Sequence, residues 1–160
     1  MATSKSAKSL LKIHNAALKG HFEICKLIAS SLNGSNPTNN NGNTPLHNAA
    51  KEGHFEIYKI IAKNVVNKNT KNNENWTPLH WAAKRGDFQM CKYIVKNMGK
   101  SEDKNPKNRD GNTPLHLVAM DGNFAMYKFI LKEVKDKIPT NNTGKTPQDY
   151  CNDFISNFKP

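Results

Sequence analysis

One short phrase recurs along this chain at a nearly fixed interval, which limits the folds open to it. Thr-Pro occurs four times, with spacings of 33, 36 and 33 residues, at Thr44, Thr77, Thr113 and Thr146. A step of 33 residues back from His47 reaches His14, in a segment that matches the later copies but lacks Thr-Pro. A period of this length indicates a repeat protein, in which each copy packs on its neighbours. We therefore expect a single domain of about four and a half units.

Each copy divides into two helical segments joined by a tight turn. Thr is a good N-cap, and Pro suits the first helical position because its missing N–H would have no partner there. Leu79, Ala82 and Ala83 follow at helical spacing, and Gly86 is suited to the left-handed conformation that ends a helix. A second amphipathic segment begins at Phe88. Asn-rich connectors, which suit turns, join the copies. Because each copy consists of two helical segments, the sequence predicts an all-α fold.

The motif and the period resemble those of the ankyrin repeat family. TPLHxAA occurs at residues 44–50 and 77–83, and TPLHLVA at 113–119. The resemblance covers about residues 9–158. It implies a solenoid of stacked helix-turn-helix units joined by long hairpin-like loops. The unusual ends, with Leu11 in place of Thr and Gln148-Asp149 in place of Leu-His, are typical of capping units with one neighbour.

The spacing predicts six segments within one domain. They are a flexible N-terminal tail (1–8), an N-terminal capping repeat (9–41), repeat 2 (42–74), repeat 3 (75–110), repeat 4 (111–143) and a partial C-terminal capping repeat (144–160). The three residues by which one interval exceeds 33 fall in MGKSEDKN, which has the composition of a loop.

The histidines and cysteines do not form a pattern typical of catalysis or metal binding. His14, His47, His80 and His116 share one repeat position, and the resemblance implies that they form hydrogen bonds between neighbouring units. A zinc site needs about four converging ligands, whereas one histidine per unit would be spread along the solenoid. Cys25, Cys91 and Cys151 have no recognisable base and orienting group, and no phosphate loop, HExxH or GxSxG motif is present. We expect a non-catalytic protein without metal or cofactor.

The positive charge of the chain favours acidic or mixed-charge partners. The net charge is +11 and the pI is about 9.6. Seven lysines would form a stripe along the second helices: Lys26, Lys59, Lys92, Lys128, Lys63, Lys96 and Lys132. Such a stripe could bind nucleic acid nonspecifically, but it lacks interleaved aromatic residues and a groove-reading motif. A solvated face is therefore the preferred interpretation.

The sequence also favours a particular compartment. No apolar run approaches the roughly 20 residues of a membrane span, and the N-terminus lacks the pattern of a signal peptide. The three widely spaced cysteines do not suggest a disulfide framework. We expect an intracellular monomer, cytoplasmic or nuclear.

Function is expected at the positions that the repeat leaves variable, on the concave face that the architecture forms from loop tips and first helices. These positions are Asn41, Asn43, Asn48, Lys51, Glu52, Glu74, Trp76, Trp81, Lys84, Arg85, Asp110, Asn112, Leu117, Met120 and Asp121. The chain's two tryptophans, Trp76 and Trp81, both fall in repeat 3, and aromatic residues beside Arg85 are typical of binding hot spots. The same spacing about the Thr77 cap is that of a hydrophobic staple, so both roles remain open.

The sequence therefore predicts a protein–protein interaction module centred on repeat 3. Two alternatives stay open: a targeting segment of a larger effector or enzyme, and a basic surface for nucleic acid.

Overall fold

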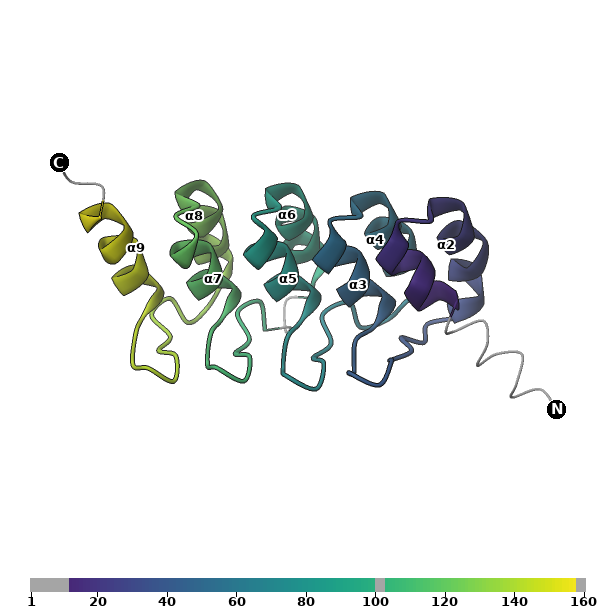
Figure 1. Cartoon of the computed structure of the whole chain (residues 1–160), viewed down its shortest axis with the longest axis horizontal. Helices are drawn as coiled ribbons and strands as arrows, with labels where there is room; N and C mark the ends of the chain where they lie inside the picture. Colours follow the sequence, from purple (N-terminus) through teal and green to yellow (C-terminus); the bar gives the residue numbers. More distant parts are fainter. Residues whose placement is uncertain (1–11, 100–102, 158–160) are drawn as a thin grey trace.

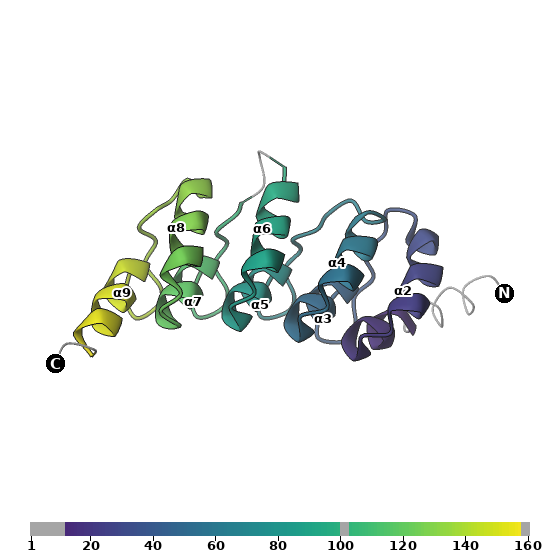
Figure 2. The same cartoon turned by 90° about the horizontal axis from the view of Figure 1, so that it is seen from above.

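Two parallel rows of helices form the molecule in the computed structural model, which describes residues 12–99 and 103–157 (Figure 1). The first row contains helical residues 12–19, α3 (Pro45–Glu52), α5 (Pro78–Arg85), α7 (Pro114–Met120) and α9 (Pro147–Ser156). The second row contains α2 (Phe22–Ala29) with the 3-10 turn η1 (Ser30–Leu32), α4 (Phe55–Ala62), α6 (Phe88–Asn97) and α8 (Phe124–Glu133). Figure 2 shows the rows side by side. The predicted all-α solenoid is confirmed.

The loops between units lie together on one side of the rows (Figure 1). No β-strand occurs in the described ranges, where an isolated bridge joins Gly34 and Val65. Each tip is nevertheless closed like a hairpin, as when the Asn72 N–H donates to the Trp76 carbonyl at 2.8 Å. The predicted flexible tail, residues 1–8, lies outside the described residues.

Threonine begins α3, α5, α7 and α9 through a reciprocal pair of hydrogen bonds. In α5 the His80 N–H donates to Thr77 Oγ1 at 3.4 Å, and the Thr77 N–H donates to His80 Nδ1 at 3.1 Å. The same box occurs in α3 and α7, and in α9 Asp149 takes the histidine's place. Because two N–H groups at the helix start gain acceptors, each Thr-Pro fixes where a helix begins.

A glycine in the left-handed conformation ends α3, and a side chain of the next unit lies close to it. Gly53 has φ +76°, and a Cβ atom at this position would lie 2.3 Å from Arg85 Nε. Arg85 Nη1 also donates to the Lys51 carbonyl at 3.4 Å, near the helix end where a cation is favourable. Glycine is therefore favoured here by its backbone conformation, and it leaves space for the Arg85 side chain.

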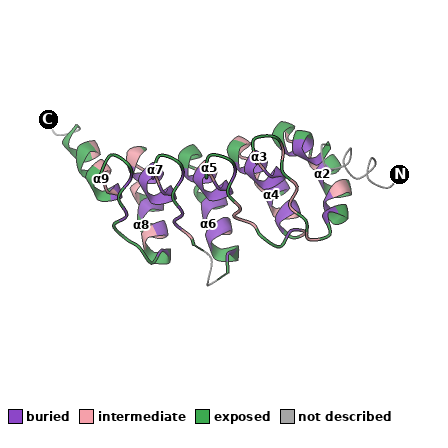
Figure 3. Cartoon of the chain, turned by 90° about the horizontal axis from the view of Figure 1, so that it is seen from below, coloured by how far each residue is buried: buried purple, intermediate pink, exposed green. Residues whose placement is uncertain are grey.

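The core lies between the two rows (Figure 3). The Leu of each TPLH motif and an Ile of each facing second helix are fully or almost fully buried, and the alanine pairs between them are buried as well. Small residues let first helices stack closely, which explains why the motif repeats with so little variation. The fully or almost fully buried Leu and Ile are Leu46, Leu79, Leu115, Ile61, Ile94 and Ile130.

Asparagine side chains link the loop tips of neighbouring units. Asn72 Oδ1 accepts from the N–H groups of Glu74 and Trp76 within its own tip, and Asn72 Nδ2 donates to Asn43 Oδ1 of the preceding tip at 2.7 Å. Asn141 makes the matching bond to Asn112 at 2.8 Å. We call these links between tips the asparagine ladder. The Asn-rich connectors are therefore part of the inter-unit contact as well as turn formers.

Replacing Asn72 with alanine is expected to destabilise the fold by about 1–3 kcal/mol, because three hydrogen bonds of a buried side chain to part-buried partners are lost. Urea unfolding of the wild type and Asn72→Ala measures the difference. Asn40→Ala is the matched control, since Asn40 is exposed in the same kind of tip, and it should change stability by less than about 0.5 kcal/mol. Equal losses in both variants would contradict a structural role for the ladder.

Candidate functional site

The variable positions lie along the first helices and the loop tips, which we call the first-helix face. All of the expected binding residues except Asn48 and Leu117 are at least partly exposed. Asn48 is buried and its Nδ2 donates to the His14 carbonyl at 3.1 Å, and Leu117 belongs to the core. The expectation that these two face a partner is therefore corrected. Asn43 and Asn112 are half-buried, with their side chains accepting the ladder bonds.

Trp76 and Trp81 lie against each other on this face. Their ring centroids are 4.4 Å apart and the ring planes are inclined by 32°. Both indoles are half-buried and pack on the core, so each keeps part of its surface open to solvent. The contact joins the residue before the Thr77 cap to the first turn of α5, which is the geometry of a hydrophobic staple.

Two lysines lie over the faces of these indoles. Lys51 Nζ of α3 is 5.2 Å from the Trp81 ring centroid, and Lys84 Nζ of α5 is 5.3 Å from Trp76 and 6.0 Å from Trp81. Such cation–π contacts contribute about 0.5–1 kcal/mol at exposed sites. Trp76, Trp81, Lys51 and Lys84 form the tryptophan–lysine cluster, which spans two units and combines flat apolar surface with fixed positive charge.

The cluster interrupts the asparagine ladder. Asn108 occupies the position of Asn72 and Asn141, but the residue 33 positions after Asn43 is Trp76, which offers no side-chain acceptor. Asn108 is 4% exposed and its Nδ2 has no hydrogen-bond partner. A buried unpaired donor costs on the order of 1–3 kcal/mol. The sequence signal for this break is one repeat position that holds Asn43, Trp76 and Asn112 in successive units. The free-energy cost of the break depends on how the units pack.

A second unpaired donor belongs to the cluster itself. Trp81 Nε1 is buried and has no hydrogen-bond partner, whereas Asn48, at the same repeat position, donates to the His14 carbonyl. Repeat 3 therefore leaves two buried donors unpaired, whereas Asn72, Asn141 and Asn48 at the equivalent positions are paired. Departures of this kind are expected where function competes with stability.

Three histidines of the TPLH motif connect neighbouring units. Nε2 donates to the carbonyl of the next unit: His47 to Trp76 at 3.0 Å, His80 to Asn112 at 3.1 Å and His116 to Lys145 at 3.1 Å. Because Nδ1 accepts from the threonine N–H, the ring is neutral with its proton on Nε2. The inter-unit hydrogen bonds that the family resemblance implied are confirmed for these three.

Burial keeps these histidines neutral. It lowers the pKa of both His47 and His80 to about 4, and the backbone hydrogen bonds to Trp76 and Asn112 only partly oppose that shift. Burial also lowers the pKa of His14 and His116. In the unit of His14, the position of the capping threonine is Leu11, which lies outside the described residues. His47, His80 and His116 therefore serve as structural connectors between units.

The cysteines are buried and weakly acidic. Burial raises the pKa of the Cys25 thiol to about 11 and also raises the pKa values of Cys91 and Cys151. A thiol in this state is a poor nucleophile. Within the described ranges, no three side chains of His, Cys, Asp or Glu are grouped closely enough to hold a metal ion. In those ranges, no helix has the length and apolar character to cross a bilayer.

Comparison with known families agrees with this geometry. Residues 13–108 match the family model of ankyrin repeats in three copies, and residues 110–141 match the model of a single ankyrin repeat. The chain belongs to the ankyrin repeat family. Ankyrin repeats are in general protein–protein interaction modules and typically lack enzymatic activity. A search of curated proteins found no match to the chain.

Proposed function

We propose that this chain is a non-catalytic binding module that holds a protein partner against the tryptophan–lysine cluster of its first-helix face. The observation that carries this proposal is Trp76, which replaces a ladder asparagine and leaves Asn108 Nδ2 unpaired. The helix start does not require a staple, because α3 and α7 begin with the same capping box after Asn43 and Asn112. A residue that leaves a buried donor unpaired without a structural need is best explained by binding.

The chemistry of the cluster favours a partner with acidic or mixed charge. Half-buried indoles supply large, rigid contact area, and tryptophan and arginine are enriched among residues that dominate interface energy. Lys51 and Lys84 place ammonium groups over the rings, and Arg85 donates to the Lys51 carbonyl. Burial raises the pKa of nearby Asp121 while the charge of Lys84 opposes that shift. A partner that inserts an apolar side chain between flanking carboxylates would match this surface.

Replacing Trp76 with asparagine separates binding from folding. This substitution restores the acceptor that Asn108 lacks, so the regained hydrogen bond should offset much of the lost indole packing and keep stability within about 1 kcal/mol of the wild type. The same change should weaken partner affinity by at least about 2 kcal/mol if Trp76 is an anchor. Urea unfolding measures the first quantity, and calorimetry with a purified partner, first captured by the wild-type chain, measures the second.

A pair of lysine substitutions provides the control. Lys84→Ala should weaken binding because Lys84 lies over both indoles, whereas Lys92→Ala, an exposed position on α6, should leave affinity unchanged. An unchanged affinity of a folded Trp76→Asn variant would remove the cluster as the binding site. Loss of binding in Lys92→Ala alone would move the interface to the second-helix row.

A further inference from the structure

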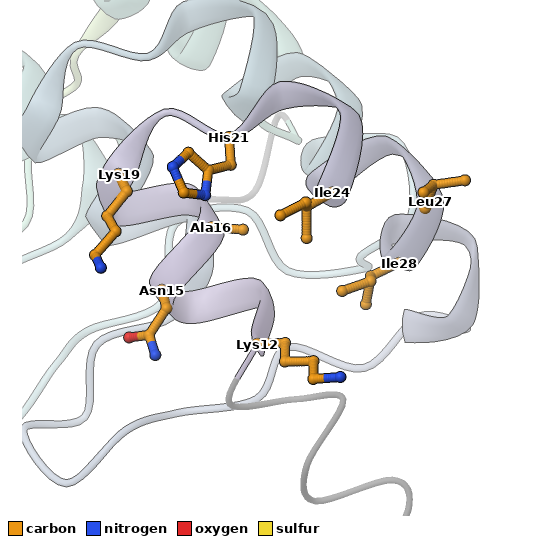
Figure 4. A pocket seen from close by; sticks show the side chains of 8 residues that line it. All are labelled: Lys12, Asn15, Ala16, Lys19, His21, Ile24, Leu27 and Ile28. Carbon is orange, nitrogen blue, oxygen red and sulfur yellow. The ribbon is translucent and has the colours of Figure 1, made fainter.

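The second helix of the first unit exposes apolar residues at positions that the later units bury fully or in part. Ile24 of α2 is 42% exposed and Leu27 is 77% exposed. Ile57, Met90 and Met126, which hold the position of Ile24 in later units, are all 3% exposed or less. Figure 4 shows Ile24, Leu27 and Ile28 along one side of α2. These apolar residues therefore suit a packed interface but lie open in the described part of the chain.

The later units show what kind of element covers this side. In the second row, α4 packs on α2 and α8 packs on α6. Ile24, Leu27 and Ile28 hold the repeat positions of Ile57, Ile60 and Ile61. No second-row helix precedes α2 in the described part of the chain. The side chains present here thus have the pattern of a helix-on-helix contact.

The open side of α2 borders a hollow with a basic rim. The hollow has a volume of about 480 Å³, and Ala16, Ile24, Leu27 and Ile28 supply its apolar lining. Lys12 and Lys19 stand on the neighbouring helix beside it (Figure 4). Lys12, Lys19 and Lys26 outnumber Glu23, the single acidic residue between positions 12 and 28. We call this surface of Lys12, Lys19, Ile24, Leu27 and Ile28 the N-terminal face.

We propose that the N-terminal face binds an amphipathic helix of another protein, with an apolar stripe flanked by acidic side chains. This helix takes the place that a preceding second helix would hold, and its carboxylates pair with Lys12 and Lys19. The site is separate from the tryptophan–lysine cluster and does not depend on it. Opposite charge across the rim favours such a helix over a neutral or basic one.

Other occupants fit this face less well. Residues 1–11 carry Lys5 and Lys8 and no acidic residue, so their charge does not complement the rim. A second copy stacked end to end would bring α9 against the first row, and in the described ranges no second helix follows α9 to cover α2. Two copies meeting through this same face would bring like charges together.

The test uses the full 160-residue chain and two labelled peptides that differ only in charge. Each peptide has about 20 residues, above the length at which isolated helices become stable in water, and a Leu/Ala stripe. One peptide has glutamate on both flanks and the other has lysine. Fluorescence anisotropy should show binding of the glutamate peptide, with the lysine peptide at least about tenfold weaker, and added salt should weaken the glutamate complex.

Two exposed apolar positions give a matched pair of variants. Leu27→Asp should weaken the glutamate peptide at least about tenfold, because it places a carboxylate in the apolar stripe. Ile138→Asp, at a position 74% exposed far along the chain, should leave it unchanged. Both substitutions replace exposed side chains, so both variants should fold, which circular dichroism checks.

Three results would overturn the proposal. Equal binding of the two peptides would remove the charge argument, and undiminished binding to Leu27→Asp would place the contact elsewhere. Sedimentation showing that the wild-type chain self-associates, and that Leu27→Asp is monomeric, would assign the face to a second copy. Unchanged peptide binding by Trp76→Asn is expected and shows that this face acts independently of the tryptophan–lysine cluster.

Discussion

Acidification from pH 7 to 4.5 is expected to lower the free energy of unfolding by about 5 kcal/mol through His47 and His80. Their folded-state pKa is about 4, whereas the ordinary value of 6.5 applies once the chain unfolds. Below pH 6.5 the unfolded chain takes up protons at these rings and the folded chain does not. The unfolded state then binds more protons, so stability is fully present above 6.5 and is lost as the pH falls toward 4.

Urea unfolding at several pH values measures this dependence, and the range above pH 4.5 keeps most carboxyl titration out of it. His80→Gln removes one of the titrating rings, so the slope of stability against pH should decrease by up to about 1.4 kcal/mol per pH unit. The change of unfolding free energy with pH can be compared between the two proteins even though His80→Gln is less stable than the wild type at every pH. A wild-type stability that does not change between pH 7 and 5 would show that the rings are not held neutral.

His80→Ala is expected to destabilise the fold by about 3–5 kcal/mol. The ring joins the Thr77 cap to the Asn112 carbonyl of the next unit, so its removal leaves buried partners unpaired and a cavity between two units. Denaturant unfolding at pH 7 measures the loss. At this pH the ring is neutral, and the effect is separate from protonation.

His54 offers the comparison. It is half-buried and makes one bond, from Nε2 to the Leu18 carbonyl at 3.3 Å, so His54→Ala should cost less than about 1 kcal/mol. If His80→Ala were no more disruptive than His54→Ala, the TPLH histidine would not be a principal connection between units.

The tryptophan–lysine cluster and the N-terminal face differ in how they depart from the repeat. At Trp76 the side chain differs from its neighbours, and a ladder amide loses its acceptor. At Leu27 the side chain conforms to the apolar pattern, but the preceding helix that would cover it is not present in the described part. The first departure is a change of side chain, and the second is the apolar pattern of the repeat without a covering helix among the described residues. The proposed partners differ accordingly: an acidic or mixed-charge protein surface at Trp76 and an amphipathic helix at Leu27.

Much of the architecture followed from local sequence. Thr-Pro starts, glycine ends and a 33-residue period determine where helices begin, end and pair, because these signals act over a few residues of backbone. The candidate cluster was also visible in part, since Trp76 and Trp81 stand out when equivalent positions are compared. Their staple contact follows from local helix geometry.

Packing between units decided the rest, because it joins residues about 30 positions apart. The bond from Asn72 to Asn43, the burial of Asn48 and Leu117, and the unpaired amide of Asn108 all depend on which side chains meet across a unit boundary. The period predicts that such meetings occur, but a hydrogen bond requires atoms placed within a few tenths of an ångström. Only the stacked structure therefore separates the variable residues that serve the fold from those left free to bind.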